Sequence, residues 1–305
     1  MARAVDEVGG TLIGPNCIGM MNIFHTSVFT TPIPLLWPRG CDFISGSGAT
    51  AVFIMEAGIP KGLRFSSIWS VGNSAQTTVE DILAYFDETF DPEVSSRVKL
   101  LYLETVKDPD KLLLHSASLI RKGCRIAAIK AGSSSAGSRA ASSHTGALVS
   151  SDAAVEALFR KAGIVRCYGR EELVTVANVF LCKELKGRKM AIITHAGGPG
   201  VMLTDALEDG GLTIPVIPNS PAKSKLKEKL LPGSSVENPF DILATGTADH
   251  LRDIIDACEH DFDVDGMAVI FGSNGLVPVR EVYDLIGEQM QRCSKPIYPI
   301  LPSII

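Results

Sequence analysis

Short apolar runs alternate with longer amphipathic segments from about residue 42 onward. The apolar runs predict β-strands, and the segments between them, whose apolar residues recur every three or four positions, predict helices. The predicted strands are Asp42–Ser45, Ser66–Val71, Val98–Leu103, Arg125–Lys130 and Ile164–Cys167, and the predicted helices cover residues 49–57, 78–88, 109–122, 148–162 and 170–184. Such alternation is typical of a parallel sheet with helices on both faces, here of flavodoxin-like size.

A second alternating unit begins after Lys186-Gly187-Arg188. The segment Thr30–Arg39 contains Pro32, Pro34 and Pro38, which predicts an extended linker leading into the first unit. The fold class is therefore predicted as α/β, with two consecutive flavodoxin-like domains and boundaries at 1–34, 35–186 and 187–305. The elements predicted for the second unit are strands Met190–Thr194, Met267–Phe271 and Pro296–Leu301, and helices ending at Glu208 and covering 247–258 and 279–292.

Composition narrows the class of protein. The chain has 305 residues, 46% of them apolar, and a net charge of −5 without a basic cluster, which argues against nucleic acid and anionic membranes as partners. No apolar run reaches the length of about 20 residues that a membrane-spanning helix needs, so a cytoplasmic location is expected. The seven cysteines are scattered without C-x-x-C spacing, which predicts reduced thiols and no metal site.

Three predicted strands end in residues suited to chemistry, and ligands of parallel sheets gather at these carboxyl ends. Ser45-Gly46-Ser47-Gly48 opens a helix and offers backbone N–H groups to an anion, although such repeats are more often plain turns. Glu104 follows a buried strand, where a solvent-facing turn carboxylate is the simpler interpretation. The third strand leads through a Ser-, Gly- and Ala-rich stretch, expected to be a mobile loop, to His144.

His144 is expected in a small loop just before the helix predicted over 148–162. Neutral imidazole is nucleophilic near pH 7, and a helix N-terminus stabilises a phosphate, so we interpret His144 as a phosphorylatable histidine. The alternative is a histidine in an ordinary polar loop.

The segment Ser142-Ser143-His144-Thr145-Gly146-Ala147-Leu148, preceded by Ala128-Ile129-Lys130-Ala131-Gly132, resembles the NDP-forming acyl-CoA synthetases, of which succinyl-CoA synthetase is a member. Further matches follow in the family's order: GPNC at 14–17, SGSG at 45–48, Glu104, HAGGPG at 195–200 and ENPFD at 237–241. This order is more specific than any single motif.

The resemblance implies roles for individual residues. His144 would carry the phosphoryl group between acyl phosphate and nucleotide, and Glu104 would hold its imidazole. The loops containing Ser45, Gly46, Ser47 and Gly48 and containing Gly197, Gly198 and Gly200 would aim two helix dipoles at the phosphohistidine. His195 is a second candidate for the catalytic histidine, but the resemblance assigns this role to His144. A last group, Asn16, Cys17, Gly72 and Asn73, would line the CoA and substrate site, although a simple turn explains Gly72 and Asn73 about as well.

The resemblance also implies components outside this sequence. Coenzyme A is expected as a substrate, with acyl-CoA and phosphate as reactants. The front of a CoA-binding Rossmann domain, of which residues 1–34 would be the end, and the ATP-grasp domains that bind Mg-ATP/ADP or Mg-GTP/GDP would come from elsewhere in a longer chain or from a partner subunit in an oligomer. Two alternatives stay open: a CoA-sensing regulatory region of a protein lysine acetyltransferase, and a non-catalytic scaffold.

Overall fold

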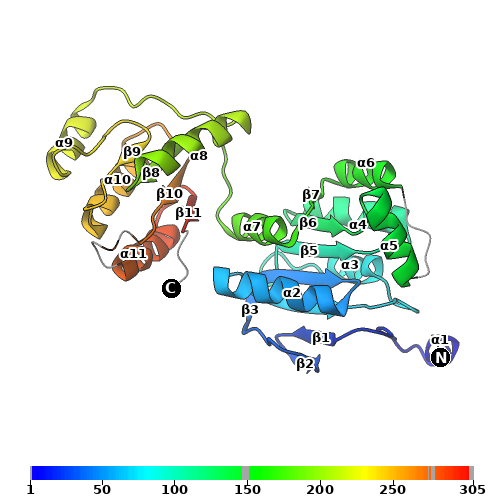
Figure 1. The fold of residues 1–305 in the computed structure, drawn as a ribbon. Helices are drawn as coiled ribbons and strands as arrows, with labels where there is room; N and C mark the ends of the chain where they lie inside the picture. Colours follow the sequence, from blue (N-terminus) through cyan, green and yellow to red (C-terminus); the bar gives the residue numbers. More distant parts are fainter. Residues whose placement is uncertain (1, 146–150, 274, 276–278, 302–305) are drawn as a thin grey trace. The chain divides into compact units, whose positions relative to one another are not determined.

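The computed structural model describes residues 2–145, 151–273, 275 and 279–301, and nothing is described for the side chains of residues 141–145. The chain divides into two compact units, residues 1–181 and 182–305 (Figure 1). The sequence placed this division between residues 186 and 187. Among the described residues, no helix is long and apolar enough to cross a membrane.

The first unit is built on a seven-stranded sheet in the order β2-β1-β4-β3-β5-β6-β7. Strands β4, β3, β5, β6 and β7 run parallel, whereas the hairpin of β1 and β2 joins β4 in antiparallel fashion. The carboxyl ends of the five parallel strands therefore lie at one edge. The strands are β1 (Gly19–Asn22), β2 (His25–Val28), β3 (Leu36–Ser45), β4 (Phe65–Ser70), β5 (Val98–Leu103), β6 (Arg125–Lys130) and β7 (Val165–Cys167).

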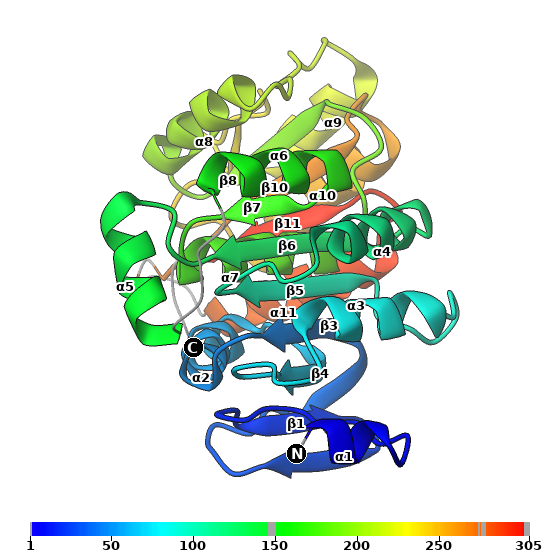
Figure 2. The same ribbon diagram turned by 90° about the vertical axis from the view of Figure 1, so that its right-hand side faces the viewer.

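Helices cover both faces of this sheet, as the alternating pattern predicted (Figure 2). Helices α2 (Gly48–Gly58) and α7 (Arg170–Leu181) pack on one face, and α3 (Val79–Glu88), α4 (Pro109–Arg121) and α6 (Asp152–Ala162) on the other. Two separate clusters of buried apolar side chains fill the spaces between the sheet and the helices on its two faces. The remaining elements are α1 (Ala2–Asp6), the short 3₁₀ helix η1 (Ile59–Lys61) and α5 (Ser135–Thr145).

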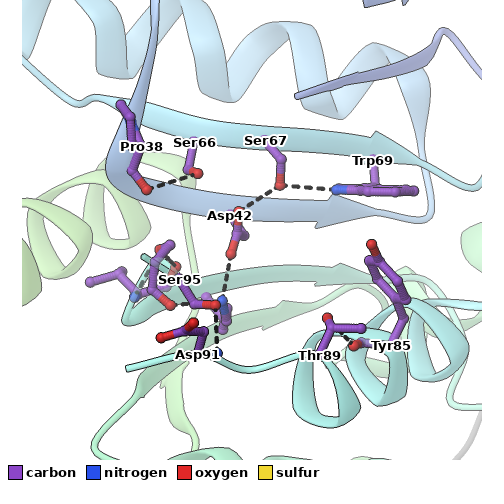
Figure 3. Close-up of polar contacts among 12 residues, drawn as sticks. Pro38, Asp42, Ser66, Ser67, Trp69, Tyr85, Thr89, Asp91 and Ser95 are labelled. Atoms are coloured by element: carbon purple, nitrogen blue, oxygen red, sulfur yellow. Dashed lines mark hydrogen bonds and ion pairs between the residues drawn. The ribbon is translucent and has the colours of Figure 1, made fainter. Parts of the chain in front are cut away.

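A buried ion pair lies inside the first unit, between β3 and β5 (Figure 3). Asp42 is 5% exposed and Lys99 is 1% exposed, and the Lys99 ammonium donates to one oxygen of the Asp42 carboxylate. The other oxygen accepts from Ser67 Oγ on β4, which in turn accepts from the Trp69 indole N–H at 2.9 Å. Burial of both charges is tolerated because each has hydrogen-bonding partners.

The second unit contains a four-stranded, fully parallel sheet in the order β11-β10-β8-β9. Its apolar core lies between this sheet and the helices α10 and α11. Only Gly200 is buried in α8. The elements are β8 (Met190–Thr194), α8 (Gly197–Asp209), α9 (Pro221–Lys229), β9 (Phe240–Asp241), α10 (Ala248–His260), β10 (Gly266–Ile270), α11 (Val279–Arg292) and β11 (Ile297–Ile300).

The α/β fold class is confirmed, and two details of the prediction are wrong. The stretch before His144 is the helix α5 and not a loop: Ser134 Oγ accepts from the backbone N–H of Gly137 at 3.0 Å, which caps the start of the helix. Residues 36–39, expected in the linker, form the start of β3.

Candidate functional site

The loop between β3 and α2 is held by a hydroxyl at the end of the strand. Ser45 Oγ donates to the carbonyl oxygen of Ser47 at 2.6 Å and accepts from the Ser47 backbone N–H at 3.2 Å. We call this arrangement the hydroxyl hook. Ser47 caps α2 by accepting from the backbone N–H of Thr50 at 3.4 Å. The first turn of α2 thus starts from a fixed loop, with Gly46 and Gly48 on either side of the cap.

Glu104 lies beside this loop, as the sheet topology requires. The backbone N–H of Gly46 donates to the carbonyl oxygen of Tyr102 at 2.9 Å. A Cβ atom added at Gly46 would lie 3.7 Å from the Glu104 amide nitrogen and 4.0 Å from its Cγ. Glu104 is half-buried. The structure therefore brings Glu104 and the predicted phosphate loop together.

Lys130, at the end of the neighbouring strand β6, adds a cation to this edge. It is 5% exposed, and its ammonium donates to the carbonyl oxygen of Ala131 at 2.5 Å. Burial lowers the pKa of Lys130, while the negative charges of Asp152 and Glu104 oppose that shift. Burial likewise raises the pKa of Tyr102, and the Glu104 charge acts in the same direction. The Glu104 charge thus acts to raise the pKa of both neighbouring groups, although burial is the larger cause in each case.

The four residues predicted to bind CoA or substrate also meet in one place. Gly72 has φ +55°, and a Cβ atom there would lie 2.3 Å from the carbonyl oxygen of Pro15 and 2.5 Å from that of Asn16. The Asn73 N–H donates to the Pro15 oxygen at 2.9 Å, and Asn16 Nδ2 donates to Asn73 Oδ1 at 3.3 Å. Cys17 follows directly, with its Sγ 3.9 Å from the carbonyl oxygen of Ile13.

Ile18, the residue after Cys17, lies next to both the β3–α2 loop and the end of β4. A Cβ atom at Gly48 would lie 2.6 Å from Ile18 Cγ2, and the Ile18 N–H donates to Ser70 Oγ at 3.2 Å. The segments 14–18, 45–48 and 70–75 therefore converge at the carboxyl edge of the sheet. Ile18 and Ser70 could not be identified as part of this site from the sequence, because the hydrogen bond between them joins segments about fifty positions apart.

His144 lies within α5 (Ser135–Thr145). The prediction that it sits just before the start of a helix is wrong, since α6 begins only at Asp152. The His144 side chain, and residues Gly146, Ala147 and Leu148 of the motif, lie outside the described part of the structure. The role of His144 stays a prediction.

The predicted glycine loop of the second unit repeats the hydroxyl hook. Thr194, the last residue of β8, donates from Oγ1 to the carbonyl oxygen of Ala196 at 2.8 Å and accepts from its N–H at 3.0 Å. Helix α8 then begins at Gly197. A Cβ atom at Gly198 would meet nothing within 4 Å, whereas one at Gly200 would lie 3.2 Å from Thr194 Cγ2. Gly198 thus leaves the helix start open, and Gly200 permits close packing of helix on strand.

Three further motif residues of the second unit have close neighbours in the structure. His195 stacks on Phe271 with ring centroids 4.6 Å apart. Asn238 of the ENPFD segment accepts from the Ile192 N–H and donates to the Met190 carbonyl oxygen, both at 2.9 Å. Asp241 of that segment points toward the glycine loop, with Oδ2 3.7 Å from a Cβ atom built at Gly197.

Comparison with known proteins identifies a family domain and relatives that this chain resembles. Residues 38–180 match the model of the succinyl-CoA ligase like flavodoxin domain. These residues belong to that domain family. The chain is 34% identical over 245 residues to the acetate–CoA ligase [ADP-forming] II subunit alpha of Pyrococcus furiosus, covering 80% of this chain and 52% of that protein. It is 35% identical to the acetate–CoA ligase [ADP-forming] I of Archaeoglobus fulgidus, covering 87% of this chain and 38% of that protein.

A solved structure extends the likeness over both units. The dinucleotide forming acetyl-coenzyme A synthetase 1 of Ca. Korarchaeum cryptofilum, in complex with phosphate and ADP, matches with a TM-score of 0.83 and 27% identity. The match covers 98% of this chain and 64% of that one. The predicted relationship to NDP-forming acyl-CoA synthetases is thereby confirmed, and the chain spans about half the length, or less, of the two relatives above.

Within the described ranges, no group of three or more His, Cys, Asp and Glu side chains is arranged to hold a metal ion.

Proposed function

We propose that this chain is part of an acid–thiol ligase of the NDP-forming acyl-CoA synthetase type. The reaction interconverts acyl-CoA, phosphate and NDP with carboxylic acid, CoA and NTP. The observation that carries the proposal is the convergence of segments 14–18, 45–48 and 70–75 with Glu104 at one sheet edge. The names of the relatives, which are ADP-forming acetate–CoA ligases, support it.

The chemistry runs in three transfers. A phosphate oxygen bonds to the thioester carbonyl carbon, and the C–S bond breaks to release the CoA thiolate. An imidazole nitrogen of His144 then bonds to phosphorus, the P–O bond to the acyl group breaks, and the carboxylate leaves. Finally a terminal oxygen of NDP takes the phosphoryl group as the P–N bond breaks, which regenerates His144 and forms NTP.

We assign the first unit's residues to these transfers by their positions. The loop from Ser45 to Gly48 would hold the phosphate at the N-terminus of α2, where groups fixed before reaction stabilise developing charge without reorganising. The N–H groups of Gly46 and Ser47 are already donated within the fold, so the donors would come from Gly48 and the first turn of α2. Glu104 would accept a hydrogen bond from an N–H of the His144 imidazole and so fix its tautomer. Asn16, Cys17, Gly72 and Asn73 would line the acyl-CoA site. In the second unit, the loop with Gly197, Gly198 and Gly200 is proposed as a phosphate-binding loop in its own right.

The proposed reaction requires nucleotide-binding machinery, which we assign to an ATP-grasp domain or partner subunit carrying Mg-ATP/ADP or Mg-GTP/GDP. An oligomeric assembly follows if that domain is a separate subunit.

Phosphopeptide mapping under alkaline conditions, which preserve phosphohistidine, tests the proposal. The full protein, or this chain with its ATP-grasp partner, is mixed with acetyl-CoA and radioactive phosphate. We expect label on His144, its loss in His144→Asn, and its retention in His260→Asn, a control on an exposed residue at the end of α10.

Three other outcomes would contradict the proposal. Label that survives His144→Asn but disappears in His195→Asn would move the phosphorylated residue to the second unit. Binding of CoA without any label on the wild-type protein would favour the CoA-sensing regulatory region, and absence of both would favour a scaffold.

A further inference from the structure

The loop after β5 carries a second charged side chain, Lys107, three positions beyond Glu104. Its ammonium reaches across to the turn after β4, where it donates to the carbonyl oxygens of Asn73 at 3.1 Å and Ser74 at 2.6 Å. Charge-assisted hydrogen bonds of this kind are stronger than those between neutral groups. Lys107 therefore connects the loop of Glu104 to the turn that contains Gly72 and Asn73.

The backbone of Lys107 is itself fixed by a buried carboxylate. Glu80, in the first turn of α3, is 1% exposed. Its Oε1 accepts from the Lys107 backbone N–H at 2.8 Å and from that of Asp108 at 3.4 Å. A carboxylate buried to this degree is held in place by its hydrogen bonds. The backbone of Lys107 is thus held against the first turn of α3, and its exposed side chain extends from there to the turn after β4.

The turn that Lys107 holds has an unfavourable backbone conformation. Gly72 has φ +55° and Ser74 has φ +52°. Both values lie in the left-handed region of backbone conformation, which residues other than glycine rarely adopt. Such a conformation persists only where surrounding contacts impose it. The same turn packs on segment 14–16 through the hydrogen bond from the Asn73 N–H to Pro15 and that from the Ala75 N–H to Gly14, both 2.9 Å.

We propose that Lys107 is a positioning residue for the acyl-CoA site. By holding the carbonyl oxygens of Asn73 and Ser74, it keeps the turn against Pro15 and Asn16 and so sets the shape of the pocket that these segments line. Lys107 acts through the turn and does not touch the reacting atoms. This role rests on the proposed function, because it assumes that segments 14–17 and 72–73 bind acyl-CoA.

The two directions of the proposed reaction allow a selective test. In the complete protein with its ATP-grasp partner, His144 can be labelled from acetyl-CoA and radioactive phosphate, or from γ-labelled ATP, and only the first route uses the acyl-CoA site. Lys107→Met removes the ammonium and keeps much of the side chain. Lys111→Met is the matched control, because the Lys111 ammonium pairs with Asp81 at 2.6 Å and holds no turn carbonyl.

We expect Lys107→Met to raise the KM for acetyl-CoA about tenfold, the size of effect that ~1.4 kcal/mol produces. Labelling from ATP should stay within about twofold of wild type, since a positioning effect on the acyl-CoA pocket leaves that route unchanged. Lys111→Met should match wild type by both routes, and Lys107→Arg, which restores a cation, should recover part of the KM.

Three results would overturn the role. The KM of Lys107→Met could equal that of Lys111→Met, or Lys107→Met could lose both labelling routes equally, as a general folding defect would cause. Wild-type protein that takes no label by either route would remove the proposed function, and the role of Lys107 with it.

Discussion

Replacing Gly72 by alanine tests whether the contact between segments 14–16 and 72–75 is as close as described. A side chain at φ +55° costs roughly 1–2 kcal/mol in a left-handed conformation. The new Cβ would also lie 2.3 Å from the Pro15 carbonyl oxygen and 2.5 Å from that of Asn16, closer than atoms approach without displacement. Overpacking of this kind adds about 1–3 kcal/mol. Gly72→Ala should therefore lower the free energy of unfolding by about 2–5 kcal/mol.

Gly62→Ala separates the two contributions. Gly62 has φ +80°, and a Cβ atom there would meet nothing within 4 Å. Its substitution should lower the free energy of unfolding by only the backbone part, about 1–2 kcal/mol.

Urea denaturation followed by tryptophan fluorescence is suited to the comparison. Both tryptophans of the chain, Trp37 and Trp69, lie in the first unit, so the signal reports that unit alone. The midpoint should fall further for Gly72→Ala than for Gly62→Ala, with similar slopes. Equal midpoints for the two variants would refute the close contact with Pro15 and Asn16.

Two further predictions concern buried charges in the first unit. Lys99→Met should lower the free energy of unfolding by about 3–5 kcal/mol, because the buried Asp42 carboxylate loses its cation. Lys61→Met is the control in the same urea assay: it breaks an exposed ion pair and should change the free energy of unfolding by about 1 kcal/mol or less. Burial alone would raise the pKa of Asp87, but hydrogen bonds from neighbours including Lys122 hold it below 3.8. A lowered pKa means that Asp87 stabilises the fold above about pH 4 and loses this effect as pH falls through its folded-state pKa. The stability difference between wild type and Asp87→Asn should therefore shrink as the pH falls from about 5 through the folded-state pKa of Asp87, and a constant difference would contradict the assigned shift.

The strands that the sequence predicted well are those with continuous apolar runs. The bounds of β5 and β6 and those of β8 agree with the predicted Val98–Leu103, Arg125–Lys130 and Met190–Thr194. Each lies inside a sheet, where both faces are covered and almost every side chain is apolar. Strand β2 was missed because none of its residues is buried, so it carries no apolar pattern.

Helix α5 was missed for a related reason. Serine, glycine and alanine suggested a loop, because the sequence of α5 has no large apolar residues whose spacing would predict a helix. The cap by Ser134 is visible only in the structure. The placement of His144 failed with it. Motif order located Glu104, Gly46 and Gly72 at the sheet edge, since each follows a strand that could be recognised. Lys107 could not be found in this way, because its proposed role rests on hydrogen bonds to residues 33 and 34 positions earlier in the chain.

The hydroxyl hook has a consequence for how freely these loops can vary. In each unit a single hydroxyl at the strand end, Ser45 or Thr194, fixes the backbone two residues on, although the loops SGSG and HAGGPG share little sequence. The backbone two residues beyond the strand is therefore held by one side chain in each unit. Loop positions without close neighbours, such as Gly198, can vary while the hook is kept, whereas Gly48 and Gly200 are restricted by close contacts. A designer could place the same serine or threonine at the end of another parallel strand to impose a loop of this shape.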